Sequence, residues 1–323
     1  MKTTIKDIAA AAGVSSATVS RVLSGRYKVS SDVRERVLHC ARAQGYRVKT
    51  GSGSRVIAVI VQNGSRIDFE GYTSMICSVL SKEIFDRGYR MEIVPMRDIE
   101  ILNERLICGA ISLLFDNGIE ATWNRNHSLP LVCVNTMSRH LDGIYSVCSD
   151  EAGGMKKAVE LLHRHGHERI GMLVSNAENL NYCNRHRREG LINAMRELKM
   201  EPPPEFRYCM SPEKIYEPLG QLLHSGITGL ICSGEGLSHA AAYALTIYGR
   251  RVPDDLSLIG YEFHWVSCFC LPRQTTLRQN LEELSRQAVN LLEQRMAGQT
   301  PAGDIVVDYQ LIERETVAAA PVR

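Results

Sequence analysis

The side chains of this chain that could do chemistry are concentrated near its start, and most of them are cations. Residues 1–55 contain eleven lysines and arginines but three acidic residues, a net charge of +8, whereas all 323 residues together carry +2. Residues 56–323 must therefore sum to −6. A cationic surface confined to one small segment attracts phosphates and leaves the rest of the chain away from them. The cations are Lys2, Lys6, Arg21, Arg26, Lys28, Arg34, Arg36, Arg42, Arg47, Lys49 and Arg55.

The elements that must position these cations are short helices. From Ile5 to Leu23 apolar residues recur at helical spacing, and Gly13 interrupts them after about two turns. Glycine suits a positive-φ turn between two helices, and Ala9 is small enough for the second helix to pack closely. Ser15 stands where the second helix needs an N-cap. This spacing predicts a helix-turn-helix.

A third amphipathic helix is predicted from about Ser31 to Gln44, and Gly45 would end it. Three short helices then close a small core under the cationic surface. The alternative is a solvated basic face on an ordinary helical bundle. We favour nucleic-acid binding because the helix-turn-helix spacing and the charge excess occur in the same segment.

The remaining composition narrows the class of protein. About 265 residues follow the headpiece, enough for two α/β lobes with sizeable cores. No apolar run approaches the roughly 20 residues of a membrane span, and the polar N-terminus predicts no secretory signal, so we expect a cytoplasmic protein. Its ten cysteines are then expected to be reduced. Cys268 and Cys270 form a C-x-C without a second pair at zinc-site spacing, so we expect no metal and no cofactor.

Residues 47–55 have the Gly/Ser-rich composition of a flexible linker, and beyond them strand and helix signals alternate. Such repeats predict parallel sheets with helices on both faces. The pattern restarts after Gly166, which predicts two similar lobes with ligand-binding groups in a cleft between them. The predicted strands are Val56–Val61, Met91–Val94, Ala110–Phe115, Leu131–Val134, Ile170–Val174, Gly229–Cys232, Leu256–Tyr261 and Ile305–Asp308. The predicted helices are Tyr72–Arg87, Gly153–His165, Arg185–Lys199, Glu213–Leu223, Leu237–Tyr248 and Leu281–Ala297.

The predicted fold class is therefore α/β, with a small all-α headpiece and two doubly wound parallel-sheet lobes. The predicted ranges are 1–46 for the headpiece, 47–55 for the linker, 56–320 for the core, 56–165 with 278–308 for the first lobe, and 166–277 with 309–320 for the second.

Several segments, taken in this order, resemble the lactose/galactose/purine repressor family, and the resemblance covers nearly the whole chain. It implies a homodimeric repressor whose helix-turn-helix pairs bind a palindromic operator. It also implies a core like a periplasmic sugar-binding protein, with a small effector between the lobes that sets DNA affinity. The segments are TIKDIAAAAGVSSATVSRVLSG (4–25), LPLVCVN (129–135), ELLHRHGHERIGML (160–173), RREG (187–190), RVPDDLSLIGYE (251–262), PRQTTL (272–277) and LIERETV (311–317).

On this resemblance the recognition helix runs from about Ser15 to Leu23, and its first residues face base edges in the major groove. Ala17 would contact a thymine methyl, and Ser16 and Ser20 would donate hydrogen bonds to bases or phosphates. Arg21 would bind a guanine or a phosphate through its two-pronged guanidinium.

The resemblance further implies that Thr4, Ser30 and Arg34 contact the DNA backbone. The alternative is that Ser16 only supports the helix cap and Ala17 only favours the helix. The implied DNA-binding residues are Thr4, Ser15, Ser16, Ala17, Thr18, Ser20, Arg21, Ser24, Ser30 and Arg34.

The resemblance also implies an effector site. Arg187, in the RREG segment, matches an arginine that binds a ligand hydroxyl or carboxylate. Glu262 stands where the family usually has aspartate, and Gln279 matches a polar pocket residue. Gly234 and Glu235 stand where the family usually has Asn-Asp, so an amide that often contacts the ligand is missing and Glu235 takes its neighbour's place.

Aromatic and basic residues complete the predicted effector site. Phe69 and Tyr72 would stack on a sugar ring or, alternatively, fill the first lobe. Arg185, His186 and Arg188 surround the predicted ligand-binding arginine and would favour an acidic or phosphorylated ligand, or else form a solvated helix turn. We favour the solvated turn for His186 and Arg188. The expected effector is a sugar or a sugar phosphate.

The linker departs from the family pattern. Family members usually continue with a hinge helix that inserts a leucine into the minor groove. Residues 47–55 lack that signature and are too short, and their glycines and serines disfavour a helix. Operator binding is therefore expected to depend more on the headpiece than on DNA bending. Met75 and Val79 would lie in the dimer interface, and without a C-terminal coiled coil we expect a dimer rather than a tetramer.

Two other functions are weighed. A sugar-binding protein explains the core but not residues 1–46. An enzyme needs a nucleophile–base pair, a metal set or a phosphate loop, and GSGS (51–54) precedes the first core strand instead of following it. His163, His165 and His167 are interpreted as surface or capping residues, so we expect no catalytic activity.

Overall fold

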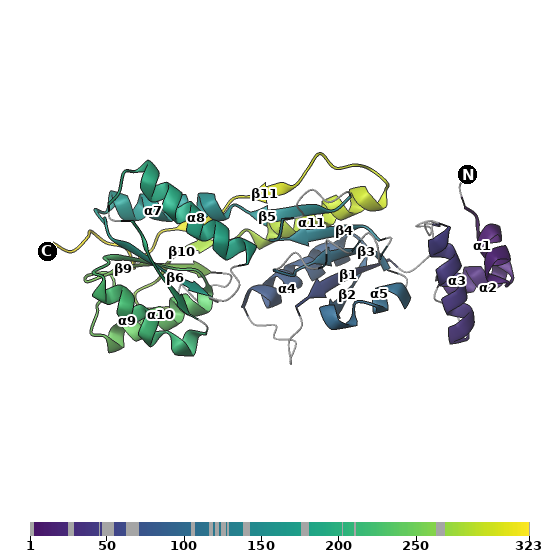
Figure 1. Cartoon of the computed structure of the whole chain (residues 1–323), viewed down its shortest axis with the longest axis horizontal. Coiled ribbons are helices and arrows are strands. Elements are labelled where there is room, and N and C mark those ends of the chain that lie inside the picture. The colour runs from purple at the N-terminus through teal and green to yellow at the C-terminus, as the bar shows by residue number, and fades with distance from the viewer. Residues whose placement is uncertain are drawn as a thin grey trace. The chain divides into compact units, whose positions relative to one another are not determined.

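Figure 1 shows the computed structural model of the chain. It describes residues 3–24, 29–44, 46, 55–62, 71–104, 107–115, 119, 123, 127, 129–137, 143–175, 181–201, 203–209, 211–262 and 269–322. The predicted linker, apart from Arg55, and the predicted helix stop at Gly45 lie outside these residues. Among the helices within these ranges, none combines the length and apolarity that crossing a bilayer requires.

The headpiece forms the predicted helix-turn-helix and third helix, as α1 (Ile5–Ala12), α2 (Ser16–Ser24) and α3 (Ser31–Ala43). Gly13 ends α1 with a φ of 64°, the left-handed conformation that glycine adopts without strain. Ala9 is buried where the helices meet, as its size predicts. The buried apolar side chains are Ile8, Ala9, Ala12, Val19, Val22, Leu23, Val37, Leu38 and Ala41.

The rest of the chain divides between two compact units, each built on one six-stranded sheet. The first sheet has the order β2-β1-β3-β4-β5-β11, and its pairs from β2 to β5 are parallel. Its strands are β1 (Val56–Val61), β2 (Arg90–Pro95), β3 (Ile107–Ser112), β4 (Leu131–Val134), β5 (Tyr145–Ser149) and β11 (Ile305–Val307). The helical segments along this part of the chain are α4 (Gly71–Asp86), η1 (Met96–Asp98), α5 (Ile101–Glu104) and α11 (Leu281–Met296).

The second sheet repeats the same order, β7-β6-β8-β9-β10-β12, with parallel pairs except for the antiparallel edge strand β12. Its strands are β6 (Ile170–Ser175), β7 (Glu205–Cys209), β8 (Gly229–Cys232), β9 (Ser257–Glu262), β10 (Thr275–Arg278) and β12 (Gln310–Ile312). Its helical segments are α7 (Glu151–Arg164), α8 (Tyr182–Glu197), η2 (Pro212–Lys214), α9 (Tyr216–His224) and α10 (Glu235–Ile247).

This order confirms the predicted α/β fold with two similar parallel sheets. In such a sheet the chain runs outward in both directions from one central position, and ligands bind beside the carboxyl ends of the strands there. In the second sheet this position lies between β6 and β8. The side chains that follow these strands are therefore the first place to look for a binding site.

Four short strands escaped the sequence-based prediction. β5 and β10 carry serines, threonines and an arginine, so they lack the continuous apolar run of a buried strand. β7 follows the three prolines at 202–204 and lies at the edge of its sheet, where half-buried side chains replace a core pattern. β12 is a three-residue edge strand.

Two expectations differ from the structure in the region of α7. The first lobe was expected to extend to residue 165, but α7 belongs to the second unit. Its buried side chains, such as Met155 and Leu162, form one core with Leu191 and Met195 of α8. His167 was interpreted as a surface or capping residue, and this is wrong, because its side chain has 0% exposure. It bonds Thr228, Ser257 and the carbonyl of Ala318 at 2.9–3.0 Å, so it fastens the C-terminal segment to the sheet.

Candidate functional site

The second helix of the headpiece has one buried and one exposed face. Val19, Val22 and Leu23 are buried in the headpiece core, because the helical repeat returns them to the same side. The opposite side exposes one continuous stripe, which a groove of duplex DNA could receive. The residues of this stripe are Ser16, Ala17, Ser20 and Arg21.

The serine and threonine residues at the helix starts hold the headpiece geometry. Thr4 forms a capping box with Asp7, whose carboxylate accepts from the Thr4 backbone N–H at 2.8 Å and from its hydroxyl at 2.7 Å. These hydrogen bonds lower the pKa of Asp7. Ser15 caps α2, because its Oγ accepts the backbone N–H of Thr18 at 3.1 Å. Thr4, Ser15 and Thr18 thus set where the helices begin.

The other predicted DNA contacts lie close to the start of α3. Ser30 is exposed, and its carbonyl accepts the first helical hydrogen bond from the backbone N–H of Arg34 at 3.0 Å. Arg34 itself is exposed one turn into the helix. Ser24 ends α2, but its side chain is outside the described part of the structure.

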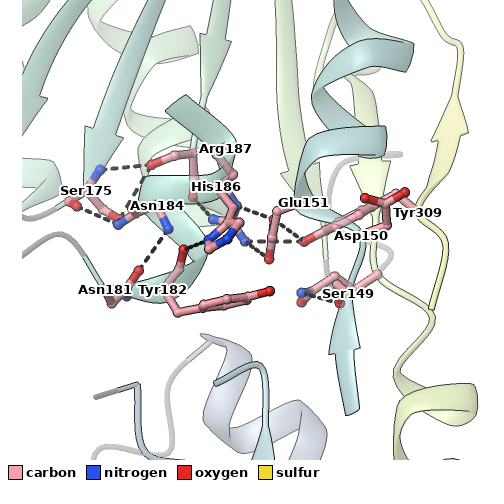
Figure 2. Close-up of polar contacts among 12 residues, drawn as sticks. Ser149, Asp150, Glu151, Ser175, Asn181, Tyr182, Asn184, His186, Arg187 and Tyr309 are labelled. Atoms are coloured by element: carbon pink, nitrogen blue, oxygen red, sulfur yellow. Dashed lines mark hydrogen bonds and ion pairs between the residues drawn. The ribbon is translucent and has the colours of Figure 1, made fainter. Parts of the chain in front are cut away.

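A second cluster of polar side chains lies at the carboxyl edge of the second sheet (Figure 2). Its centre is Arg187 on α8, which faces Glu151 on α7. Arg187 Nε donates to Glu151 Oε2 at 2.6 Å and Nη2 donates to Oε1 at 3.1 Å. The two side chains are 8% and 1% exposed, so this is a buried, two-pronged ion pair.

The remaining donors of Arg187 are also occupied. Its Nη1 donates to the carbonyl of Ser233, directly after β8, at 2.6 Å, and Nη2 donates to the hydroxyl of Tyr309 at 3.2 Å. The guanidinium stacks over the Tyr261 ring at 4.2 Å. Burial alone would lower the pKa of Arg187, but the attraction of Glu151 outweighs burial and the pKa is raised. The predicted ligand-binding arginine is thus neutralised inside the protein.

The RREG segment explains why these two helices meet. A Cβ atom at Gly190 would lie 2.7 Å from the Cα of Ala152 on α7. Only glycine therefore allows α7 and α8 to approach this closely. Asp150 caps α7 by accepting the N–H of Gly153 at 2.9 Å, which fixes the first turn from which the Glu151 carboxylate reaches the guanidinium.

Glu262 forms a separate ionic group. Its carboxylate accepts Arg278 Nε at 2.7 Å and Arg314 Nη1 at 2.8 Å, although the residue has 0% exposure. Burial raises the pKa of Glu262, but hydrogen bonds from Arg314 and Thr276 outweigh it and lower the pKa. Because side chains alternate along a strand, Glu262 and its neighbour Tyr261 lie on opposite faces of β9. The structure therefore does not pair Arg187 with Glu262.

Two buried amides at this edge have an atom without a hydrogen-bond partner in the described structure. Asn184 donates to the backbone carbonyl of Ser175 at 2.8 Å, and its Oδ1 is unpaired. Gln279, directly after β10, donates to Ser149 Oγ at 2.9 Å, and its Oε1 is unpaired. Both residues are 3% exposed. Leaving a buried polar atom unpaired costs free energy, so such atoms mark places where a ligand could bind.

Sequence reasoning missed several of these residues. Glu151, Asn184 and Tyr182 were not predicted, although Tyr182 lies at the start of α8 one turn before His186, with ring centroids 4.0 Å apart. In Figure 2 the Tyr182 ring extends toward Ser149. An aromatic residue next to the RREG segment was the available signal for Tyr182. Nothing in the sequence pairs Glu151 with an arginine 36 positions away.

The other predicted effector residues lie apart from this cluster or outside the described structure. Phe69 and the side chain of Glu235 are not described. Tyr72 is half-buried on α4. Arg185 is exposed. Arg188 stacks on Phe206 at 5.0 Å, which makes it part of the local packing of α8 on β7 rather than a solvated cation.

Comparison with known proteins places the chain in a class. A periplasmic binding protein-like domain matches residues 159–317, and the DNA-binding domain of bacterial regulatory proteins of the lacI family matches residues 4–49. The chain is 30% identical to the HTH-type transcriptional repressor CytR of Escherichia coli K12 over 341 residues, covering 98% of this chain and 97% of CytR. The fold and these matches define a helix-turn-helix transcriptional regulator with a periplasmic-binding-protein-like core.

The chain belongs to the lacI family of bacterial regulatory proteins. Solved structures support the fold. The lac repressor dimer bound to operator and the anti-inducer ONPF has a TM-score of 0.71 at 23% identity, over 99% of this chain and 100% of that chain. The complex of the transcriptional regulator CelR with cellobiose has a TM-score of 0.70 at 23% identity, over 98% of this chain and 100% of that chain.

Proposed function

We propose that the protein is a repressor of a carbohydrate-utilisation operon, controlled by a sugar or sugar derivative. The observation that carries the proposal is the joining of two features in one chain. A cationic headpiece presents the exposed stripe of α2, and the second unit gathers buried, unpaired amides at the carboxyl edge of a parallel sheet. CytR and the lac repressor are repressors, and CelR binds cellobiose, which supports this combination.

Within the headpiece we assign different roles to the predicted residues. The stripe of Ser16, Ala17, Ser20 and Arg21 contacts base edges and adjacent phosphates. Thr4, Ser15 and Thr18 act first through the helix caps that they form, and their exposed backbone and hydroxyl groups are then placed beside the phosphates. Arg34 neutralises a phosphate.

We further propose that two copies of the chain form a dimer, so that two headpieces bind the halves of a palindrome. An apolar surface on the second unit supports a homodimer. It consists of Tyr243, Ile247 and Leu271, which are 64%, 61% and 93% exposed, around a pocket of about 390 Å³. Exposed apolar surface of this kind normally becomes buried in an interface. Met75 and Val79 on α4 are half-buried and extend this proposal to the first unit.

The protein acts by binding and not by catalysis in this proposal, in the cytoplasm where its operator lies. Selection of duplexes from a random library with the full-length protein tests the proposal. An enriched palindrome, bound with an affinity that falls steeply as salt increases, is expected because the contacts to phosphates release counterions. Equal affinity for random and enriched duplexes would contradict it. The effector should be recovered chemically unchanged after incubation with the protein.

A further inference from the structure

The polar edge of the second sheet contains charges that already compensate one another. Arg187 spends all three of its nitrogen atoms on Glu151, Ser233 and Tyr309, and its side chain is 8% exposed. A guanidinium bonded in this way has neither a free donor nor an unbalanced charge to offer a phosphate. The predicted attraction for an acidic ligand is therefore removed within the protein itself.

The neighbouring charges follow the same pattern. Glu262 is held by Arg278 and Arg314, and the Arg314 side chain is 12% exposed. The Arg278 side chain is 40% exposed, so water screens the attraction of this cation for an anion. Arg185 is exposed to solvent as well. No buried cation of the described edge is left without an anionic or carbonyl partner.

What the edge does offer is neutral hydrogen-bonding capacity. The orientation of the Asn184 amide is fixed, because its Nδ2 donates to the Ser175 carbonyl, which can only accept. The unpaired Oδ1 is therefore an acceptor that needs an O–H or N–H donor. The Gln279 amide has one unpaired atom as well, beside its bond to the Ser149 hydroxyl.

We infer that the effector is an uncharged, hydroxyl-bearing molecule, a sugar or a nucleoside without phosphate or carboxylate. Asn184 and Gln279 are its specificity-determining residues, and Arg187 is a positioning residue. A ligand hydroxyl pairs with Asn184 Oδ1, a second polar group pairs with Gln279, and the half-buried ring of Tyr182 provides an apolar surface between α8 and Ser149 (Figure 2). This inference rests on the proposed function, because it names the ligand of the same regulator.

Titration calorimetry of the full-length protein with matched pairs tests the inference. Each pair joins a neutral compound to its phosphate: ribose with ribose 5-phosphate, glucose with glucose 6-phosphate, cellobiose with its 6′-phosphate, and uridine with uridine monophosphate. The neutral member of at least one pair should bind at least tenfold more tightly than its phosphate. Tighter binding of a phosphate, or binding by none of the neutral members, would overturn the inference.

Variants separate positioning from contact. Asn184→Leu and Gln279→Leu should each weaken binding of the neutral ligand at least tenfold while melting temperature and ligand-free operator affinity stay unchanged. Glu151→Gln should release the charge of Arg187 and shift the neutral-to-phosphate affinity ratio toward the phosphate at least tenfold. Glu197→Gln, which removes an exposed carboxylate paired with Lys156, is the matched control and should leave the ratio unchanged.

Two further results keep the test decisive. If Glu151→Gln does not fold, Asn184→Asp replaces it, because this change keeps the acceptor, adds a negative charge and should weaken the phosphate further. A phosphate preference that Arg278→Gln abolishes would contradict the inference. Ligand-free binding to the selected palindrome is measured separately, so failure of the repressor proposal and failure of the inference give different results.

Discussion

The headpiece and the carboxyl edge of the second sheet use arginine in opposite ways. On α2 Arg21 is exposed beside small polar side chains, in a segment where cations outnumber acids eleven to three. On α8 Arg187 is buried and bound to Glu151 on three sides of a closed network. The same side chain therefore serves binding in one region and architecture in the other. What decides its role is whether the fold supplies a counter-charge, which a motif alone does not reveal.

The largest effect that tests this contrast is expected at the buried ion pair. Glu151→Ala leaves the Arg187 guanidinium buried without its anion, which should lower the free energy of unfolding by about 3–5 kcal/mol. Urea unfolding of the full-length protein measures this change. Glu197→Ala, which breaks the exposed pair with Lys156, should cost less than about 1 kcal/mol. Equal effects of the two variants would show that the buried pair is not special.

Removing the exposed cation should have the complementary result. Arg21→Ala should leave unfolding nearly unchanged but weaken operator binding by about 1–3 kcal/mol, because a contact to a base or phosphate is lost. Fluorescence anisotropy with the selected palindrome measures this loss. Arg196→Ala, an exposed arginine on α8, is the control and should bind the operator as the wild type does. An unaltered operator affinity in Arg21→Ala would remove this residue from the DNA contacts.

A smaller effect is expected from pH, through His167. Burial lowers the pKa of this imidazole from its ordinary value of 6.5, and the carbonyl of Ala318 offsets part of that effect. The unfolded chain therefore binds the proton more readily than the folded chain does. Stability should be complete above about pH 6.5 and decline as pH falls through 6.5 toward the lower folded-state pKa. Thermal unfolding from pH 8 to pH 5 should show this decline.

Two variants control the pH measurement. His167→Asn should flatten the pH dependence, while His163→Asn, on the exposed side of the same helix end, should keep it. If both variants retained the wild-type slope, another group would be responsible.

The contrast also shows what the sequence could predict. The helix-turn-helix depends on neighbours one or two turns apart, so the positions of Gly13, Ser15 and Val19 were enough to place α2 and its exposed stripe. The alternation of strands and helices likewise predicted the α/β fold. Short strands such as β10 were missed, because two threonines and an arginine give no apolar run.

The effector edge was less predictable for a physical reason. Arg187 could be located from the RREG segment, but its charge state in the fold depends on Glu151, which α7 delivers from 36 positions earlier in the chain. Gly190 makes that approach possible, and its role in packing appears only when both helices are placed. The unpaired atoms of Asn184 and Gln279 likewise become visible only when all their neighbours are known.

The central claim is that one chain couples operator binding to a small molecule. Anisotropy titration of the labelled palindrome with the full-length protein, with and without a saturating neutral ligand identified by calorimetry, tests that claim directly. The account predicts tight, palindrome-specific binding whose Kd changes at least tenfold when the ligand is added, in keeping with ordinary allosteric coupling. The same Kd with and without a ligand that demonstrably binds, or equal binding of random duplex, would contradict it.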